Sequence, residues 1–140
     1  MLRTVEIRHY MVSKPVTVKP DMNISEAAGI IIKNKVSGVV VVDDDGRLVG
    51  MLSELDCLKS IVNSVYSDGN AAGALVRDIM TKEVEVNHPH DDIVNVAASM
   101  LDHKHRRRPI VADGKLVGQV TCRQILKAVK EFGWTSDGDE

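Results

Sequence analysis

The chain has 140 residues, and its 18 Lys and Arg against 20 Asp and Glu leave a formal net charge of −2. Hydrophobic residues make up 44% and charged residues 27%, a balance typical of a folded globular protein. The low net charge and an aromatic content of 3% disfavour nucleic acid as a partner. No apolar run approaches the ~20 residues of a membrane-spanning helix, so no membrane partner is expected.

The two cysteines, Cys57 and Cys122, are isolated and lack the CxxC spacing of zinc and redox sites. The sequence therefore indicates neither a disulfide framework nor a cysteine-based zinc site. The first residues also lack the apolar segment of a secretory signal. These features favour a cytoplasmic protein.

The first predicted elements are a strand and a helix. Residues 11–18 favour a short strand. In residues 23–35 the apolar side chains recur every three to four positions, the spacing of an amphipathic helix. Asn23 and Glu26 have the spacing of a capping box and predict where this helix begins.

A hairpin and a second helix follow. Asp45-Gly46 separates the apolar run 39–42 from the segment 47–50, and Asp-Gly in this position predicts a tight turn whose two central residues take positive φ. The helix after the hairpin carries the apolar residues Leu55, Leu58, Ile61, Val62 and Val65.

The second half of the chain repeats this order. The helical pattern that begins at Ile24 returns 69 positions later at Ile93, in a helix for which Asp91 and Asp92 are candidate N-caps. A short strand is expected within residues 80–86. The second hairpin and its closing helix are marked by Asp113-Gly114, Ile125, Leu126 and Val129. One such unit is too small to bury its sheet and helices alone, so the two copies should pack together.

This duplicated order resembles the tandem CBS domain, named after cystathionine β-synthase and also called the Bateman module. The segments that carry the resemblance are 10–16, 79–84, 45–50, 113–118 and 53–56. It implies an α+β fold of two pseudo-symmetric β-α-β-β-α repeats packed as one module. The expected boundaries are 8–66 for the first repeat, 67–73 for a linker, 74–132 for the second repeat and 133–140 for a tail.

The same resemblance implies a function. CBS proteins bind AMP, ADP, ATP or related adenosyl ligands in clefts between their repeats and usually regulate another protein. We therefore expect a non-catalytic regulatory module that binds an adenosine nucleotide, needs no cofactor and forms a homodimer. AMP or ADP is favoured over ATP, because three phosphates would call for more cations than Arg106 and Arg107. The regulated partner is not identifiable from the sequence.

The family's ligand motif stands at residues 50–56, where the resemblance places Ser53 near phosphate and Asp56 on ribose. An ionised carboxylate can accept hydrogen bonds from both hydroxyls of a cis-diol. The alternative is purely structural, because Ser-x-x-Asp before an apolar helix is also a capping box. In the second copy, Thr121 and Gln124 keep the capping pattern and lose the carboxylate. Two unequal clefts are expected, the first binding and the second weaker, altered or empty.

A basic cluster precedes the second hairpin, and the resemblance assigns Arg106 and Arg107 to phosphate, in the cleft that takes its ribose carboxylate from Asp56. Guanidinium groups suit phosphate because they donate two parallel hydrogen bonds and stay charged. The alternative is a solvated charge run at a helix end, which fits Lys104 and Arg108 better. Apolar walls for the adenine are expected from Pro15, Val16 and Val36 on one side, or from Val84, Val86 and His105 on the other. The remaining expected ligand-binding residues are Lys14, Ser37 and, in the second copy, Thr121.

Three alternatives remain open at this point. The pairs His88/His90 and His103/His105 suggest a metal site, although no acidic or cysteine spacing supports one. The protein could be a ligand-free dimerisation scaffold, or a nucleic-acid-binding CBS protein that uses residues 106–108. Catalysis is not expected, because no nucleophile, general base or nucleotide-binding glycine loop is present in the motifs.

Overall fold

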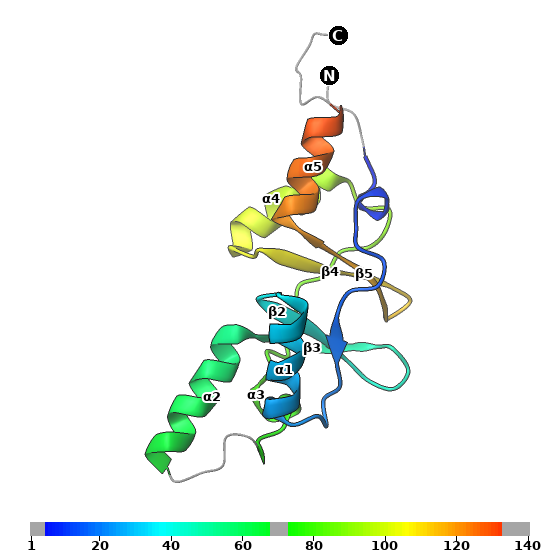
Figure 1. The fold of residues 1–140 in the computed structure, drawn as a ribbon. Helices are drawn as coiled ribbons and strands as arrows, with labels where there is room; N and C mark the ends of the chain where they lie inside the picture. Colours follow the sequence, from blue (N-terminus) through cyan, green and yellow to red (C-terminus); the bar gives the residue numbers. More distant parts are fainter. Residues whose placement is uncertain (1–4, 68–72, 133–140) are drawn as a thin grey trace. The chain divides into compact units, whose positions relative to one another are not determined.

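The computed structural model describes residues 5–67 and 73–132, which form two compact units (Figure 1). The first unit runs from Pro15 to Val84. The second unit combines the residues through Lys14 with those from Glu85 onward. Most of the expected linker and all of the expected tail lie outside the described residues.

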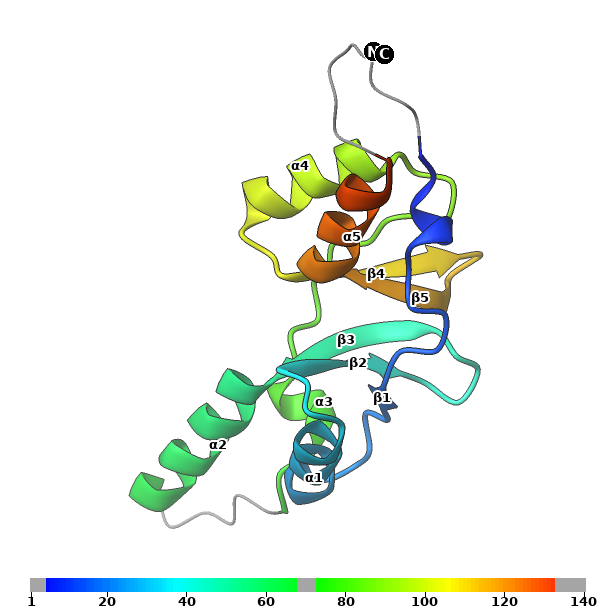
Figure 2. The same ribbon diagram turned by 45° about the horizontal axis from the view of Figure 1, so that its top comes forward.

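The first unit contains a three-stranded sheet in the order β1-β2-β3, with β1 parallel and β3 antiparallel to β2. Helix α1 covers this sheet, and α2 leaves the end of β3, as Figure 2 shows. The elements are β1 (Thr17–Val18), α1 (Ile24–Asn34), β2 (Gly38–Val42), β3 (Leu48–Ser53), α2 (Glu54–Ser67) and α3 (Val76–Ile79).

The predicted start of α1 is confirmed. Asn23 Oδ1 accepts the Glu26 N–H at 2.9 Å, and Glu26 Oε1 accepts the Asn23 N–H at 3.4 Å, which completes the capping box. The apolar side of the helix packs into a buried cluster with β2 and β3, whose most buried members are Val18, Ile24, Ala27, Ile31, Val39, Val41, Leu52, Cys57 and Val76.

The second unit holds the antiparallel pair β4 and β5 with two longer helices. Its elements are η1 (Ile7–His9, a 3₁₀ turn), α4 (Ile93–His103), β4 (Arg107–Ala112), β5 (Lys115–Thr121) and α5 (Cys122–Phe132). The short helices α3 and η1 occupy matching places in the two units, and the sequence patterns predicted neither of them.

The strand expected within residues 80–86 is not formed. Its counterpart in the first repeat is the two-residue strand β1, and in the second repeat a single parallel bridge joins Asn87 to Ile110. The chain turns immediately afterwards, because Asp91 Oδ2 accepts the side-chain N–H of Asn87 at 2.8 Å and the backbone N–H of His88 at 2.9 Å.

Two other local predictions also needed correction. Asp92 is the N-cap residue of α4 but makes no side-chain capping bond, and its Oδ1 accepts the Val5 N–H at 3.2 Å instead. The second hairpin has the predicted turn, with positive φ at both Asp113 and Gly114, whereas the first has positive φ only at Gly46. The first turn is one residue longer and is closed by Asp43, whose carboxylate accepts two backbone N–H groups within it.

Each hairpin is completed by the leading segment of the other repeat. We call residues 5–14 and 76–84 the leading segments of the first and second repeats. Val12 pairs with Gln119 of β5, and Thr81 pairs with Met51 of β3, each through two backbone hydrogen bonds of 2.8–3.0 Å. The compact units and the sequence repeats therefore overlap without coinciding.

Candidate ligand-binding site

Ser53 and Asp56 meet at the junction of β3 and α2. The Ser53 N–H donates to Asp56 Oδ2 at 2.9 Å, and the Asp56 N–H donates to Ser53 Oγ at 3.1 Å. The capping box considered as the structural alternative is therefore formed. It uses one carboxylate oxygen and one lone pair of the hydroxyl, so Asp56 Oδ1 and the Ser53 hydroxyl proton can still meet a ligand. Both side chains are partly exposed.

The segment before β2 lies beside this junction. The carbonyl of Ser37 accepts the Glu54 N–H at 2.9 Å, and Gly38 pairs with Ser53 across the β2–β3 ladder. Val36 packs against the core of the same unit, as does Val16. The first unit thus brings Ser37 next to Ser53 and Asp56, with Val36 directly before Ser37 in the chain.

The corresponding junction in the second unit has different chemistry. Gln124 Oε1 accepts both the Thr121 N–H at 2.7 Å and the Thr121 hydroxyl at 2.6 Å. The hydroxyl proton is therefore already donated within the protein, and the carboxylate is replaced by a neutral amide. The Arg106 carbonyl accepts the Cys122 N–H at 3.2 Å, just as Ser37 accepts that of Glu54. Arg106 is thereby placed beside Thr121.

The basic cluster does not behave as one solvated run. Arg106 is exposed and Arg107 is partly buried, but only 1% of the Arg108 surface is accessible. The assignment of Arg108 to a solvated surface is wrong. Its guanidinium donates to Asn87 Oδ1 at 2.7 Å and to Ser99 Oγ at 3.0 Å, and its NH2 group lies 3.3 Å from His105 Nδ1.

His105 connects this buried cation to the segment that carries the candidate phosphate ligands. Burial lowers the pKa of its imidazole, and the nearby positive charges of Arg108 and His103 lower it further, while Glu85 acts in the opposite direction. The rings of His103 and His105 are stacked with their centroids 5.3 Å apart. His105 is therefore held towards its neutral form.

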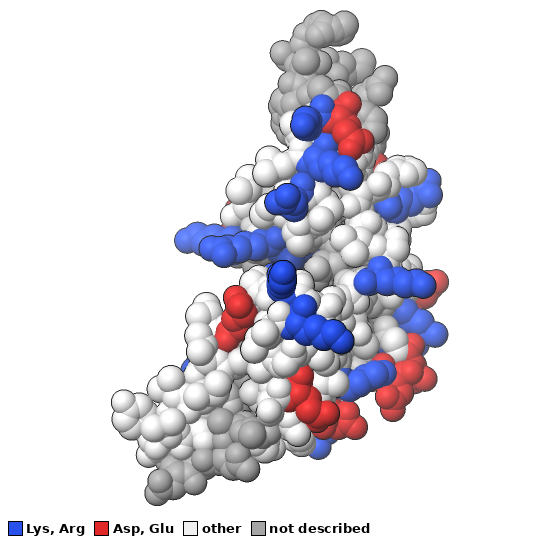
Figure 3. Space-filling view, viewed as in Figure 1, with Lys and Arg blue, Asp and Glu red and all other residues white. Residues whose placement is uncertain are grey.

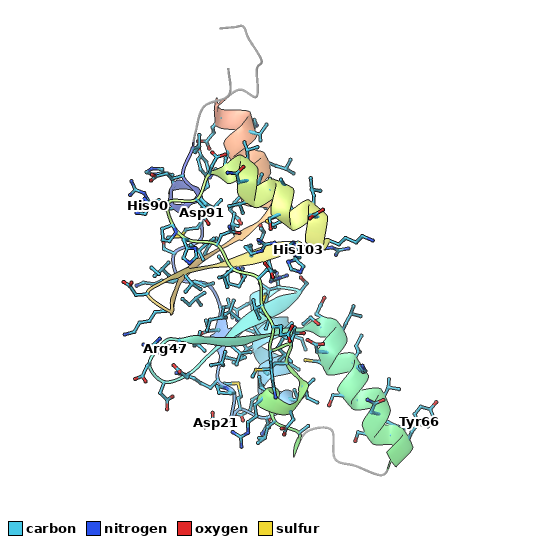
Figure 4. All side chains as sticks on the ribbon, turned by 180° about the vertical axis from the view of Figure 1, so that it is seen from behind. Asp21, Arg47, Tyr66, His90, Asp91 and His103 are labelled. Atoms are coloured by element: carbon cyan, nitrogen blue, oxygen red, sulfur yellow. The ribbon has the colours of Figure 1, made fainter. Side chains whose placement is uncertain are left out.

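The histidines do not assemble a metal site in the ranges that the structure describes. His90 Nδ1 lies 3.2 Å from Glu6 Oε1, and His103 Nδ1 lies 2.8 Å from the Ser99 carbonyl. Figure 4 shows His90 and His103 well apart. Within residues 5–67 and 73–132, no three His, Cys, Asp or Glu side chains are grouped so that they could hold a metal ion.

The surface adds little support for a nucleic-acid interface. On the face shown in Figure 3, Lys and Arg side chains are spread over the surface and are not gathered into one large patch.

None of the helices within the described ranges has both the length and the hydropathy that crossing a bilayer requires.

A family model described as CBS domain matches residues 7–63 and again residues 76–131. The chain belongs to the CBS domain family. Its fold is that of a CBS pair, with a short β-sheet and helices in each of the two repeats. The resemblance to the tandem CBS domain and the α+β fold class, both predicted from the sequence, are confirmed.

Known CBS proteins resemble the chain over most of its length. The chloroplastic CBS domain-containing protein CBSX1 of Arabidopsis thaliana is 31% identical over 144 residues, covering 86% of this chain and 61% of that protein. The chain thus spans less than two thirds of that relative. The crystal structure of CBSX2 in complex with AMP has a TM-score of 0.80 and 30% identity, covering 91% of this chain and 97% of the other. The CBS domain pair of protein MJ0100, in complex with 5′-methylthioadenosine and S-adenosyl-L-methionine, has a TM-score of 0.76 and 25% identity, covering 93% and 99%.

Proposed function

We propose that this CBS pair is a non-catalytic regulatory module that binds an adenosine nucleotide, AMP or ADP in preference to ATP. The observation that carries the proposal is the Ser53–Asp56 box, which leaves a carboxylate oxygen and a hydroxyl proton available at a partly exposed helix start. The adenosyl ligands of CBSX2 and MJ0100 support the ligand class. A regulated partner protein is part of this proposal, and its identity is open.

In this proposal, different side chains contact the ribose, the phosphate and the base of the ligand. Asp56 accepts hydrogen bonds from ribose, while Ser53, Arg106 and Arg107 donate to phosphate. The base lies against Pro15, Val16 and Val36 or, alternatively, against Val84, Val86 and His105. Lys14 and Ser37 complete the expected ligand-binding residues. Thr121 is the weaker counterpart of Ser53, because its hydroxyl proton is already donated to Gln124.

Ligand binding should raise the thermal stability of the protein. A ligand that binds only the folded state stabilises it by RT ln(1 + [L]/Kd), about 2.7 kcal/mol at a hundredfold excess over Kd. We expect AMP or ADP to raise the Tm in a thermal-shift screen that also includes ATP, NAD and S-adenosyl-L-methionine, and calorimetry to give the affinities. If none of these five ligands changes the Tm or produces heat, the module does not sense adenosine nucleotides.

An exposed apolar face on α2 favours the expected homodimer. Leu55, Leu58, Val62 and Val65 follow the 3-4-3 spacing of a helix-packing seam, and Leu55 and Val65 are 75% and 72% exposed. Figures 1 and 2 show most of this helix extending away from the rest of its unit. We propose that a second copy of the chain covers this face. The same face would serve a scaffold without a ligand, which is the second candidate function.

The double substitution Leu58→Glu with Val62→Glu should convert the dimer to a monomer of 15.3 kDa. It places two carboxylates on the apolar seam, where dimerisation would remove them from water without partners. Light scattering coupled to size exclusion measures the mass. Leu58→Met, which keeps the apolar surface, should remain dimeric. A wild-type protein that is monomeric at high micromolar concentration would contradict the proposal.

A further inference from the structure

Four positions in the second repeat exchange an apolar cluster for a hydrogen-bonded polar one. In the first repeat, Val18 and Val39 belong to the buried core, and Ile30 and Val36 pack against it. The residues 69 positions later are Asn87, Arg108, Ser99 and His105, in the same order. These four side chains contact one another through Arg108. At these four positions the two repeats therefore share a fold but differ in the chemistry of their interior.

The hydrogen bond between Arg108 and His105 fixes the protonation of the imidazole. A guanidinium can only donate, so His105 Nδ1 must accept and its proton must lie on Nε2. Protonating Nδ1 would place an N–H group against the guanidinium N–H group and would add a second positive charge next to it. Proton uptake and this hydrogen bond therefore exclude each other.

The charges around His105 do not compensate for a second positive charge beside Arg108. Within the described part of the chain, the Arg108 guanidinium contacts the neutral groups of Asn87, Ser99 and His105, and its Nε lacks a hydrogen-bond partner. His103 stacks on His105, and Glu85, which is exposed, is the nearby negative charge. One exposed carboxylate does not neutralise a buried Arg108 together with a protonated His105.

We propose that the Arg108–His105 hydrogen bond is a proton-operated lock on residues 104–107, closed while His105 is neutral and opened when His105 is protonated. Residues 104–106 link α4 to β4, and Arg107 is the first residue of β4. Lys104 takes a left-handed conformation with φ 57°, and the His105 N–H donates to the Met100 carbonyl at 2.8 Å. Arg106 and Arg107 lie in the same segment. The lock is a property of the second unit, and its effect on ligand affinity rests on the proposed function of those two arginines.

The direction of the pH dependence follows from the lowered pKa of His105. Below the ordinary histidine pKa of ~6.5, the unfolded chain binds the proton more readily than the folded chain does. Stability from this residue is therefore present above that pH and is lost as the pH falls through the lowered value. Between pH ~6.5 and the lowered pKa of His105, the folding equilibrium constant should fall up to ~10-fold for each unit by which the pH falls.

Two variants of the ligand-free full chain test the lock. His105→Asn keeps an acceptor near the Nδ1 position but cannot titrate in this range. The fourfold exchange Asn87→Val, Ser99→Ile, His105→Val and Arg108→Val gives the second repeat the interior residues of the first. Amide exchange of residues 104–107, corrected for intrinsic rates, should accelerate ~10-fold or more between pH 7.5 and 5 in the wild type and stay constant in both variants.

An NMR titration provides the direct measurement. His105 should be the Nε2–H tautomer at neutral pH and should titrate below ~6.5. A midpoint at or above that value, or equal acceleration of exchange in the wild type and His105→Asn, would overturn the lock. If the midpoint and the exchange rates follow the expectation but no nucleotide binds, the lock stands and the proposed function fails. If AMP binds but its affinity and the exchange rates ignore pH, the lock is wrong and the proposed function stands.

Discussion

Replacing Asp56 by Asn should weaken AMP binding about 10- to 100-fold while leaving the fold intact. An asparagine can still accept the Ser53 N–H that Asp56 Oδ2 accepts at 2.9 Å, so the start of α2 keeps its capping bond. The ligand, however, loses an ionised acceptor and meets an NH2 donor instead. Hydrogen bonds to charged groups contribute about 1.5–3 kcal/mol, which corresponds to the stated loss.

Calorimetry measures the affinity, and a thermal melt without ligand checks the fold. Asp44→Asn is the matched control, since it removes the same charge from the same unit, on a side chain that is 100% exposed in the β2–β3 turn. This variant should bind AMP as the wild type does. Equal affinities for the two variants would show that Asp56 only caps its helix and that the ribose is held elsewhere.

Replacing Gly50 by Ala should lower the free energy of unfolding by about 1–3 kcal/mol, the range found for overpacked interiors. A Cβ on Gly50 would lie 2.6 Å from Met80 Sδ and 2.8 Å from the carbonyl oxygen of Thr81. The methionine can swing aside, but the carbonyl belongs to the backbone that pairs with Met51. The leading segment of the second repeat would therefore have to move away from β3.

Urea denaturation of three variants separates this clash from the general effect of adding a methyl group. Gly118→Ala should cost less than Gly50→Ala, because a Cβ there meets chiefly the flexible Met11 side chain, with the Val12 carbonyl oxygen at 3.0 Å. Gly29→Ala, on the exposed side of α1 with no atom within 4 Å of the new Cβ, should stabilise by about 0.5–1 kcal/mol. If Gly50→Ala and Gly29→Ala shift stability equally, the close contact at Gly50 is not a constraint.

Local sequence patterns predicted those elements whose causes are local. The capping box depends on two residues three positions apart, Asn23 and Glu26, and the turn depends on the adjacent pair Asp113-Gly114, so spacing alone was sufficient for both. The side chain of Asp92, by contrast, does not make the capping bond that its position suggests. Its carboxylate binds Val5, which is 87 positions away, and no local pattern reveals such a competitor. The exchange of leading segments was missed for the same reason, because it depends on pairing between distant residues.

The candidate site was predictable to a similar extent. The Gly-x-x-Ser-x-x-Asp spacing located Ser53 and Asp56, and the structure shows the bonds that this spacing permits. Arg108 was misplaced because a run of basic residues usually faces solvent. A position-by-position alignment of the two copies aligns Arg108 with the buried Val39 and Asn87 with the buried Val18. A polar pair at two core positions is the signal that points to a buried network.

The crossing of the leading segments makes each half of the chain depend on the other for a backbone partner. A solitary copy of the repeat would leave Met51, or Gln119, without the strand partner supplied from the other half. Two separate copies could form these backbone hydrogen bonds only by exchanging their leading segments, and this exchange would carry the entropic cost of association. Fusing them in one polypeptide makes that trade intramolecular and raises the effective concentration of each partner segment. The covalent link between the two halves thus makes their reciprocal pairing independent of protein concentration.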